Sequence, residues 1–289
     1  MKVLLTGANG QLGNCIKAIC PLNYELINTD RQQLDITDIL AIEAIINKYK
    51  PDVIINSAAY TAVDRAEDEP TLANQINVIG PQNLAIVAKK YNIKLIHIST
   101  DYVFDGNQNI PYNENDVTNP INVYGKTKRH GEITVLNNDP SSIIIRTSWV
   151  FSEYGNNFVK TMLKLSKTRT ELSVINDQIG NPTYAGDIAL TIFDILEKNI
   201  PGGIYHYCGD QSVSWYEFAK RIFDIEQQLN STIKKSPVNV SPILTKDYPT
   251  KACRPLYSVL DMQKINLLTG ISGSDWNKAL RHVIPRINL

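Results

Sequence analysis

The chain has 289 residues, of which 43% are hydrophobic and 20% are charged. These proportions are typical of a globular protein with enough apolar side chains for one large domain or two modest ones. The 29 basic and 29 acidic side chains cancel. Because no strongly basic surface is implied, we expect neither nucleic acid nor a membrane as the main partner.

The first half of the chain alternates short β-branched segments with amphipathic helical ones, as in a parallel sheet covered on both faces. Strands are predicted, in chain order, at Lys2–Leu5, Tyr24–Asn28, Val53–Asn56, Lys94–Ile98 and Ser142–Arg146. Helices are predicted between them at Gln11–Cys20, Asp38–Tyr49, Thr71–Tyr91 and Val123–Asn138. The predicted fold class is α/β, with a Rossmann-type doubly wound parallel sheet.

The second half of the chain has more prolines and shorter, irregular apolar segments. We predict a Rossmann domain over residues 1–150, which also takes later segments near 175–210, and a smaller α/β substrate-binding lobe over 151–289. Ligands of open α/β sheets bind beyond the carboxyl ends of the strands. A second lobe over that edge would form a binding cleft.

The cysteines are scattered along the chain without a Cys-x-x-Cys pair: Cys15, Cys20, Cys208 and Cys253. We expect free thiols in a reducing compartment. No apolar segment reaches the ~20 residues of a membrane-spanning helix, and the first residues lead directly into a strand, so a cytoplasmic location is predicted. Cys15 and Cys20 face different sides of a helix and make poor metal ligands.

Three glycines with the spacing G-x-x-G-x-x-G follow the first predicted strand: Gly7, Gly10 and Gly13. The first permits a tight turn, the second lets the backbone approach a pyrophosphate, and the third lets the next helix lie close to the sheet. The helix N-terminus adds positive partial charge where the phosphates would sit. This spacing predicts a dinucleotide site of the kind found in short-chain reductases.

Two neighbouring residues after the second strand favour different dinucleotides. Asp30 stands where an acidic residue contacts the adenosine ribose 2′-hydroxyl of NADH, whereas Arg31 could meet the 2′-phosphate of NADPH. The sequence leaves NADH and NADPH open, and Asp30 could also simply begin a loop. Asp35 and Ile36 would lie near the adenine by the same geometry.

The third strand ends in the small residues 56–59. Small side chains there would let a cofactor cross the strand ends closely. They would equally let the strand pack tightly against a helix, and composition leaves both interpretations open.

Tyr124 and Lys128 lie four residues apart at the start of a predicted helix, so they share one face with Cβ atoms about 5–6 Å apart. A ketone reductase needs a proton donor beside the carbonyl that receives hydride. A phenol titrates near 10, so acting at neutral pH requires a lowering of its pKa worth about 4 kcal/mol. One ammonium at about 4 Å supplies up to ~4 kcal/mol at an effective dielectric constant of about 20. Lys128 could also bond the nicotinamide ribose, so Tyr124 and Lys128 are predicted cofactor contacts as well. Thr100, at the end of the fourth strand, adds a hydroxyl for the same carbonyl.

Two further side chains could form the substrate cleft. Trp149 follows the fifth strand and could provide a flat wall for a base or sugar ring, or ordinary packing between the lobes. Arg254 offers a bidentate donor for a diphosphate, or an ion pair between the lobes.

Longer segments resemble the dTDP-4-dehydrorhamnose reductase family of extended short-chain reductases, nearly from end to end. The most specific are I-S-T-D-Y-V-F-D-G and R-T-S-W-V-F, and L-L-T-G-A-N-G-Q-L-G, N-V-Y-G-K-T-K and N-D-Q-I-G-N-P-T also match. The resemblance implies reduction of the C4 ketone of dTDP-4-dehydro-β-L-rhamnose by NADPH or NADH. The product would be dTDP-L-rhamnose, in the last step of its biosynthesis.

The resemblance also implies roles for individual residues. Tyr124 would be the proton donor with Lys128 as its partner, and Thr100 would tune the tyrosine and hold the carbonyl. Cofactor contacts are implied for Gly10, Gln11, Leu12, Asp30, Asp35, Ile36, Ala59, Tyr60 and Thr61. Substrate contacts are implied for Thr100, Asp101 and Trp149.

Two departures from the family pattern affect these expectations. Cys253 stands before Arg254 where the family often has a basic residue, so part of the charge for a diphosphate would come from elsewhere. The first helix lacks the carboxylate of a metal-bridged dimer described for some relatives, so we predict no structural metal and a monomer or homodimer.

Two other functions stay open from the sequence. One is a non-catalytic subunit resembling the regulatory subunit of methionine adenosyltransferase. The other is a reductase of another dTDP-4-keto-6-deoxy sugar, such as one giving 6-deoxy-talose.

Overall fold

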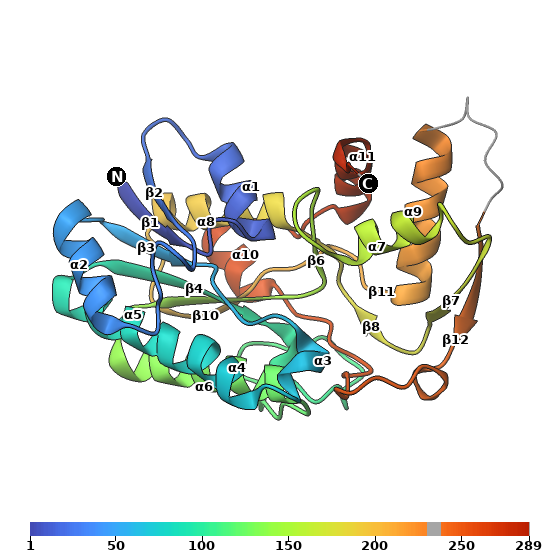
Figure 1. Ribbon diagram of the computed structural model, residues 1–289, viewed down its shortest axis with the longest axis horizontal. Coiled ribbons are helices and arrows are strands. Elements are labelled where there is room, and N and C mark those ends of the chain that lie inside the picture. The colour runs from blue at the N-terminus through green and yellow to red at the C-terminus, as the bar shows by residue number, and fades with distance from the viewer. Residues whose placement is uncertain (230–237, 289) are drawn as a thin grey trace.

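A six-stranded parallel sheet forms the centre of the computed structural model, which describes residues 1–229 and 238–288 (Figure 1). Its order is β10-β5-β4-β3-β1-β2, and every neighbouring pair is parallel. The strands are β1 (Lys2–Thr6), β2 (Glu25–Thr29), β3 (Val53–Asn56), β4 (Lys94–Thr100), β5 (Ile143–Thr147) and β10 (Gly203–His206). The predicted doubly wound sheet is confirmed. β10 was not among the predicted strands.

The position of β1 creates the crevice expected of this topology. The chain places β2 on one side of β1 and β3 on the other. Connections therefore leave the carboxyl ends of β1 and β3 in opposite directions, which leaves an opening between them.

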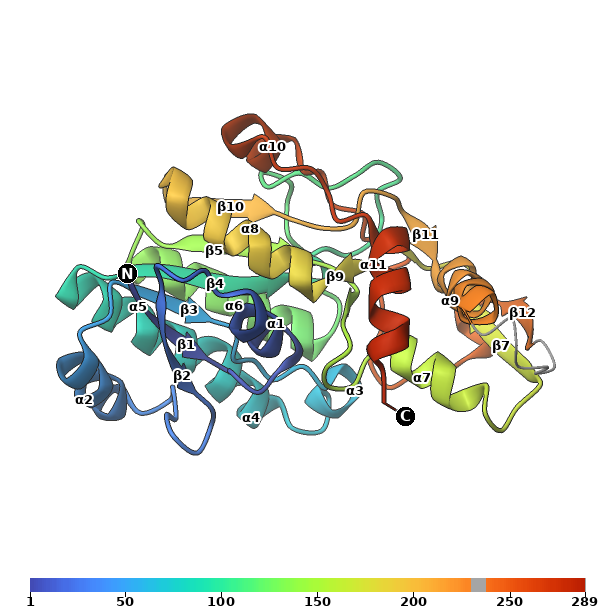
Figure 2. The same ribbon diagram turned by 90° about the horizontal axis from the view of Figure 1, so that it is seen from above.

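Helices cover both faces of the sheet because both faces of its strands are apolar (Figures 1 and 2). One face packs against α1 (Gln11–Ile19) and α8 (Ala185–Lys198). The other packs against α2 (Ile39–Tyr49), α5 (Gly80–Tyr91) and α6 (Val123–Asn138). Successive side chains of β1 point to opposite faces of the sheet. Leu4 therefore joins the core under α2, α5 and α6, while its neighbours Val3 and Leu5 join the core under α1 and α8.

The predicted helix over Thr71–Tyr91 is present, but it is not uniform. α4 (Pro70–Asn74) continues through a π-helical turn, η1 (Gln75–Ile79), into α5. Such turns often mark functional sites. Here the turn buries Asn77, whose side chain bonds both backbone groups of Tyr60. It therefore fixes the loop after β3, which the short helix α3 (Val63–Ala66) follows.

A second group of elements lies at the other end of the molecule (Figures 1 and 2). β7 (Glu171–Ile175) and β12 (Asn239–Ile243) pair in parallel beside α7 (Phe158–Leu165), α9 (Trp215–Leu229) and α11 (Trp276–Val283). Their core is rich in aromatic side chains, among them Phe151, Phe218 and Trp276. Two-residue strands join this group to the sheet: β6 (Val150–Phe151), β8 (Ile179–Gly180), β9 (Thr183–Tyr184) and β11 (Val213–Ser214).

The chain passes between the two groups more than once. β10 and α8 belong to the six-stranded sheet and its cover, and α10 (Gln263–Thr269) packs against both. Ile265 of α10 joins the core formed by α1 and α8. The domain boundary at residue 150 stays a prediction, and residues 230–237 and 289 of the predicted lobe lie outside the described part of the chain. The remaining elements are three short 3-10 helices, η2 (Asp101–Val103), η3 (Thr245–Asp247) and η4 (Ile284–Arg286).

All four cysteines carry free thiols. Among the helices of the described residues, none combines the length and the apolar character needed to cross a bilayer.

Candidate active site

The glycine turn after β1 owes its shape to close packing. Gly7 has φ +67°, and a Cβ there would lie 2.7 Å from the backbone nitrogen of Ala58. A Cβ on Gly13 would lie 2.5 Å from the Gly7 carbonyl oxygen. A Cβ on Gly10 would meet only that same oxygen, at 3.3 Å. The protein itself therefore excludes side chains at the first and third glycines, while the second leaves the space above the turn open.

A cavity of about 460 Å³ lies over the carboxyl ends of β1, β2 and β3. Nine residues predicted for the cofactor line it: Gly7, Gly10, Asp30, Arg31, Asp35, Ile36, Ala59, Tyr60 and Thr61. Sequence reasoning missed other lining residues, including Ser57, Arg65, Leu72, Gln75 and Ile76. The chain thus provides a glycine turn, an uncapped helix N-terminus and a slot bordered by small residues, which fits a dinucleotide.

Five of the predicted cofactor residues lie outside this lining, two of them, Tyr124 and Lys128, at the start of α6. Leu12 and Gly13 are buried in the packing of α1 against the turn. The Gln11 side-chain oxygen accepts hydrogen bonds from Ser152 Oγ at 3.0 Å and Asn157 Nδ2 at 2.9 Å. Gln11 therefore ties the start of α1 to the loop after β6, and its predicted cofactor contact stays a prediction.

The Asp30 carboxylate is fixed at the rim of the cavity by three donors. Its Oδ1 accepts from the backbone N–H groups of Gln32 and Gln33, at 2.9 and 3.1 Å, and its Oδ2 accepts from Asn9 Nδ2 at 2.9 Å. Arg31 lines the same cavity and is exposed. An acidic and a basic group thus both face the predicted ribose position.

The start of α6 places Tyr124 and Lys128 at the end of β4. The Asn122 side chain caps the helix by accepting from the Gly125 N–H at 2.7 Å, and its amide donates to the Cys253 carbonyl at 2.7 Å. A Cβ on Gly125 would lie 2.1 Å from the Tyr102 carbonyl oxygen, so the helix packs directly on the turn that follows β4. Tyr124 thereby lies close enough to Thr100 for this side chain to lower the pKa of its phenol.

The electrostatics of this pair differ from the sequence expectation. Burial raises the pKa of Tyr124 to about 12, outweighing the hydrogen bond with Thr100 that lowers it. Lys128 Nζ instead donates to the Ile98 carbonyl at 2.6 Å. Burial lowers the pKa of Lys128 to about 8, against the opposing charge of Glu132. The expected lowering of the phenol pKa by Lys128 is therefore not found in this arrangement.

Asp101 follows Thr100 and is almost completely buried. Its Oδ1 accepts from Thr100 Oγ1 at 2.9 Å, and no group within the described residues bonds its Oδ2. Burial raises the pKa of Asp101 to about 6, although the nearby hydroxyls of Ser258 and Thr100 oppose the rise. A buried carboxylate oxygen without a protein partner, beside Thr100, is suited to a hydroxyl of a ligand.

Trp149 adopts an unusual backbone conformation for its residue type, with φ +45°. Its indole stacks on Trp215 of α9, with ring centroids 3.5 Å apart and an interplanar angle of 6°. A Cβ on Gly180 would lie 2.5 Å from the same indole, so no larger residue fits beneath it. Trp149 thus packs against the second group of elements, and its predicted contact with substrate stays a prediction. No spacing signal in the sequence linked Trp215 to Trp149.

Arg254 is already paired in the structure. Its two guanidinium nitrogens donate to Asp64 Oδ1 at 3.1 Å and Oδ2 at 2.6 Å. Lys251 and Asp68 form a second ion pair beside it. The C-terminal segment is thereby fastened to α3, a contact that sequence reasoning left as one of two alternatives for Arg254.

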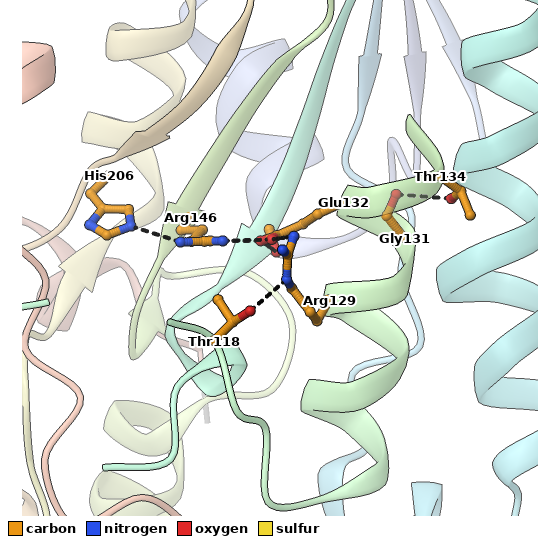
Figure 3. Close-up of polar contacts among 8 residues, drawn as sticks. Thr118, Arg129, Gly131, Glu132, Thr134, Arg146 and His206 are labelled. Carbon is orange, nitrogen blue, oxygen red and sulfur yellow. Dashed lines mark hydrogen bonds and ion pairs between the residues drawn. The ribbon is translucent and has the colours of Figure 1, made fainter. Parts of the chain in front are cut away.

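A buried charge network supports α6 one turn beyond Lys128 (Figure 3). The Glu132 carboxylate accepts from Arg146 Nε at 2.8 Å and Nη2 at 2.7 Å, and from Ser99 Oγ at 2.6 Å. Arg129 reaches the same carboxylate at 3.1 Å, and Arg146 also approaches His206. The network joins α6 to β4, β5 and β10, and so fixes the helix that carries Tyr124 and Lys128.

Across residues 1–229 and 238–288, no three His, Cys, Asp or Glu side chains are grouped so that they could hold a metal ion.

The doubly wound sheet, the glycine turn at its switch point and the Tyr-x-x-x-Lys pair facing the end of β4 define a dinucleotide-dependent reductase of the short-chain class. The chain belongs to the family described as RmlD substrate binding domain, whose model matches residues 1–289. This match confirms the resemblance carried by the sequence motifs.

Individual relatives agree over their whole length. A dTDP-4-dehydrorhamnose reductase of Aggregatibacter actinomycetemcomitans is 49% identical, with 98% of each chain covered. Among solved structures, a dTDP-4-dehydrorhamnose reductase from Clostridium acetobutylicum is 44% identical with a TM-score of 0.92 and 99% of each chain covered. The Bacillus anthracis reductase, solved in complex with NADP, is 39% identical with a TM-score of 0.92 and 98% of each chain covered.

Proposed function

We propose that this protein reduces the C4 ketone of dTDP-4-dehydro-β-L-rhamnose to dTDP-L-rhamnose, using NADPH or NADH. The observation that carries the proposal is the contact of Tyr124 with Thr100 at the end of β4, next to the cavity at the glycine turn. Relatives that match over nearly their whole length and carry the name dTDP-4-dehydrorhamnose reductase support the choice of sugar nucleotide.

The bound dinucleotide would supply the hydride. The Gly7–Gly10 turn and the N-terminus of α1 would hold its phosphates. Asp30 or Arg31 would meet the adenosine ribose, and residues 59–61 would border the path toward the nicotinamide. The small side chains that line this path support the assignment.

Thr100 and Tyr124 would bind the ketone oxygen, and the Tyr124 hydroxyl would give it a proton as the hydride arrives. Lys128 would hold the nicotinamide ribose. Asp101 and Trp149 would orient the sugar, since one has a carboxylate oxygen without a hydrogen bond and the other is a half-buried indole. Arg254 would contribute to diphosphate binding, and the elements of 151–289 would form the substrate lobe, with the reaction taking place in the cytoplasm.

The test is an assay of the purified protein with dTDP-4-dehydro-β-L-rhamnose and each nicotinamide cofactor in turn. Oxidation of cofactor only in the presence of the keto sugar, with a product that has the rhamnose configuration at C4 by NMR, supports the proposal. A talose configuration at C4 would instead identify the protein as a reductase that gives 6-deoxy-talose. Absence of reduction, together with recovery of a stoichiometric synthetase partner, would instead favour the non-catalytic subunit.

A further inference from the structure

A fully buried histidine lies beneath Lys128. His97, on β4, is 0% exposed, and its Nε2 lies 3.4 Å from Lys128 Nζ. Its Nδ1 lies 2.9 Å from Asn56 Nδ2, on the neighbouring strand β3. Burial, followed by the charge of Lys128, lowers the pKa of His97 well below its usual value, so the ring is neutral. A neutral imidazole carries one proton, on one nitrogen only.

The contacts of Asn56 decide which nitrogen carries that proton. The backbone N–H of Ala58 donates to Asn56 Oδ1 at 3.2 Å, and Thr6 Oγ1 lies 2.7 Å from the same atom. A backbone N–H can only donate, so this atom of Asn56 is the oxygen and the amide NH₂ faces His97. Nδ1 of His97 must then accept, and the proton lies on Nε2.

We propose that His97 is a positioning residue for Lys128, with the Ala58–Asn56 contact holding the imidazole in the tautomer whose Nε2–H faces the lysine amine. An ammonium has three donors and no acceptor, so a second donor aimed at it opposes the charged form. The neutral amine accepts this N–H while donating to the Ile98 carbonyl. Lys128 can therefore release a proton more easily, and its remaining N–H is directed away from β4.

The other charged groups around this pair do not reverse the effect. Glu132 and Tyr124 lie on the same helix as Lys128, and the Glu132 carboxylate is neutralised by Arg146 from β5. Burial lowers the pKa of Lys128 to about 8, although the Glu132 charge raises it. The Nε2–H of His97 would lower the pKa of Lys128 further, in the same direction as burial.

The second fully buried histidine provides an internal contrast. The Nδ1 of His206 lies 3.1 Å from the Tyr112 carbonyl, which can only accept. Its proton is therefore on Nδ1, and Nε2 is free to accept from Arg146 Nη1 at 3.4 Å. Burial lowers the pKa of His206 to about 3, so this ring is neutral as well. Two buried histidines, each with Nε2 at the same distance from a cation, are thus expected in opposite tautomers.

The tautomers can be measured by two-bond proton–nitrogen NMR on protein with ¹⁵N-labelled histidine, without substrate. Signals are assigned from the variants His97→Gln and His206→Gln. We expect His97 protonated on Nε2 and His206 on Nδ1, both unchanged between pH 6 and 9. Protonation of His97 on Nδ1, or an imidazolium form in this range, would overturn the inference.

The effect on Lys128 rests on the proposed reductase function and is measured separately. The alkaline limb of the kcat–pH profile should move upward by about one pH unit in His97→Leu, because the opposing N–H is gone. His206→Leu, which removes a buried imidazole that does not face Lys128, should leave this limb in place. An unmoved limb in a folded His97→Leu would refute the positioning role.

The two measurements separate the possible failures. If the protein lacks reductase activity while His97 shows the Nε2–H tautomer, the proposed function fails and the assigned hydrogen-bond chain stands. If His97→Leu does not fold, the wild-type tautomer alone decides.

Discussion

Arg254 and Asp64 form a two-pronged ion pair that fastens the C-terminal segment to α3. The Arg254 side chain is 19% exposed and that of Asp64 is 45% exposed, so solvent reaches both sides of the pair. An arginine held flat at this position can still present its remaining N–H groups to an anion. The contact of Arg254 with a diphosphate, which the sequence suggested, stays a prediction.

Replacement of this arginine tests that role. Arg254→Gln should raise the KM for the dTDP sugar about 10- to 100-fold with kcat little changed, since a bidentate donor to phosphate is lost. Asp64→Asn keeps the guanidinium and should not raise the KM. Steady-state kinetics of both variants provide the test. A wild-type KM in Arg254→Gln would show that the arginine does not bind the diphosphate and serves only as a contact between the lobes.

A substitution at Gly10 can test cofactor binding with little effect on the stability of the fold. Gly10→Ala should change the free energy of unfolding by less than ~1 kcal/mol, because its Cβ meets only one atom, yet weaken dinucleotide binding at least about tenfold. Gly13→Ala should cost ~1–3 kcal/mol of stability, because its Cβ would overlap backbone atoms. Calorimetric titration and denaturant unfolding of both variants provide the comparison. Unaltered cofactor affinity in Gly10→Ala would contradict the predicted phosphate site.

Tyr124→Phe removes the proposed proton donor and keeps the ring. We expect kcat to fall by about 10²–10⁴ with dinucleotide affinity nearly unchanged. Tyr102→Phe removes the hydroxyl of the adjacent ring, whose centroid is 5.8 Å away, and should have a much smaller effect. Turnover like that of the wild type in Tyr124→Phe would rule out its role as the acid.

Glu132→Gln would leave the buried Arg146 without its carboxylate. The loss of one partner of a buried pair costs about 3–5 kcal/mol. Glu43→Gln, at the more exposed Lys90–Glu43 pair, should cost less than ~1 kcal/mol. Denaturant unfolding measures both values, and equal losses would show that the buried network contributes no more than a surface pair.

Asp101 makes stability depend on pH in a predictable direction. Its folded-state pKa of about 6 lies above the ordinary value of 3.8. Between these pH values the folded state keeps a proton that the unfolded state has lost, so stability falls as pH rises through this window. The full loss at pH 7.5 is about 2–3 kcal/mol. Asp101→Asn cannot titrate, so its stability relative to the wild type should be higher at pH 7.5 than at pH 4, and an equal difference at both pH values would contradict this.

Much of the fold could be predicted because its signals are local. The five predicted strands lie within two residues of β1–β5. β10 escaped prediction because its edge position depends on pairing with β5, far away in the chain. The π-helical turn at Gln75–Ile79 was missed for a similar reason, since it buries Asn77 against the loop after β3 and the α6 helix.

By itself, the sequence determined the glycine turn, the alternation of strands and helices, and the pairing of Tyr124 with Lys128 on one helical face. These features follow from spacing over a few residues, and the motifs also identified the family. Only the tertiary structure decided the ion pair of Arg254 with Asp64, the stacking of Trp149 on Trp215, and the contact of Lys128 with His97. Each of these joins side chains that are distant in sequence, and burial then sets their charge and hydrogen-bond roles, which no spacing rule contains.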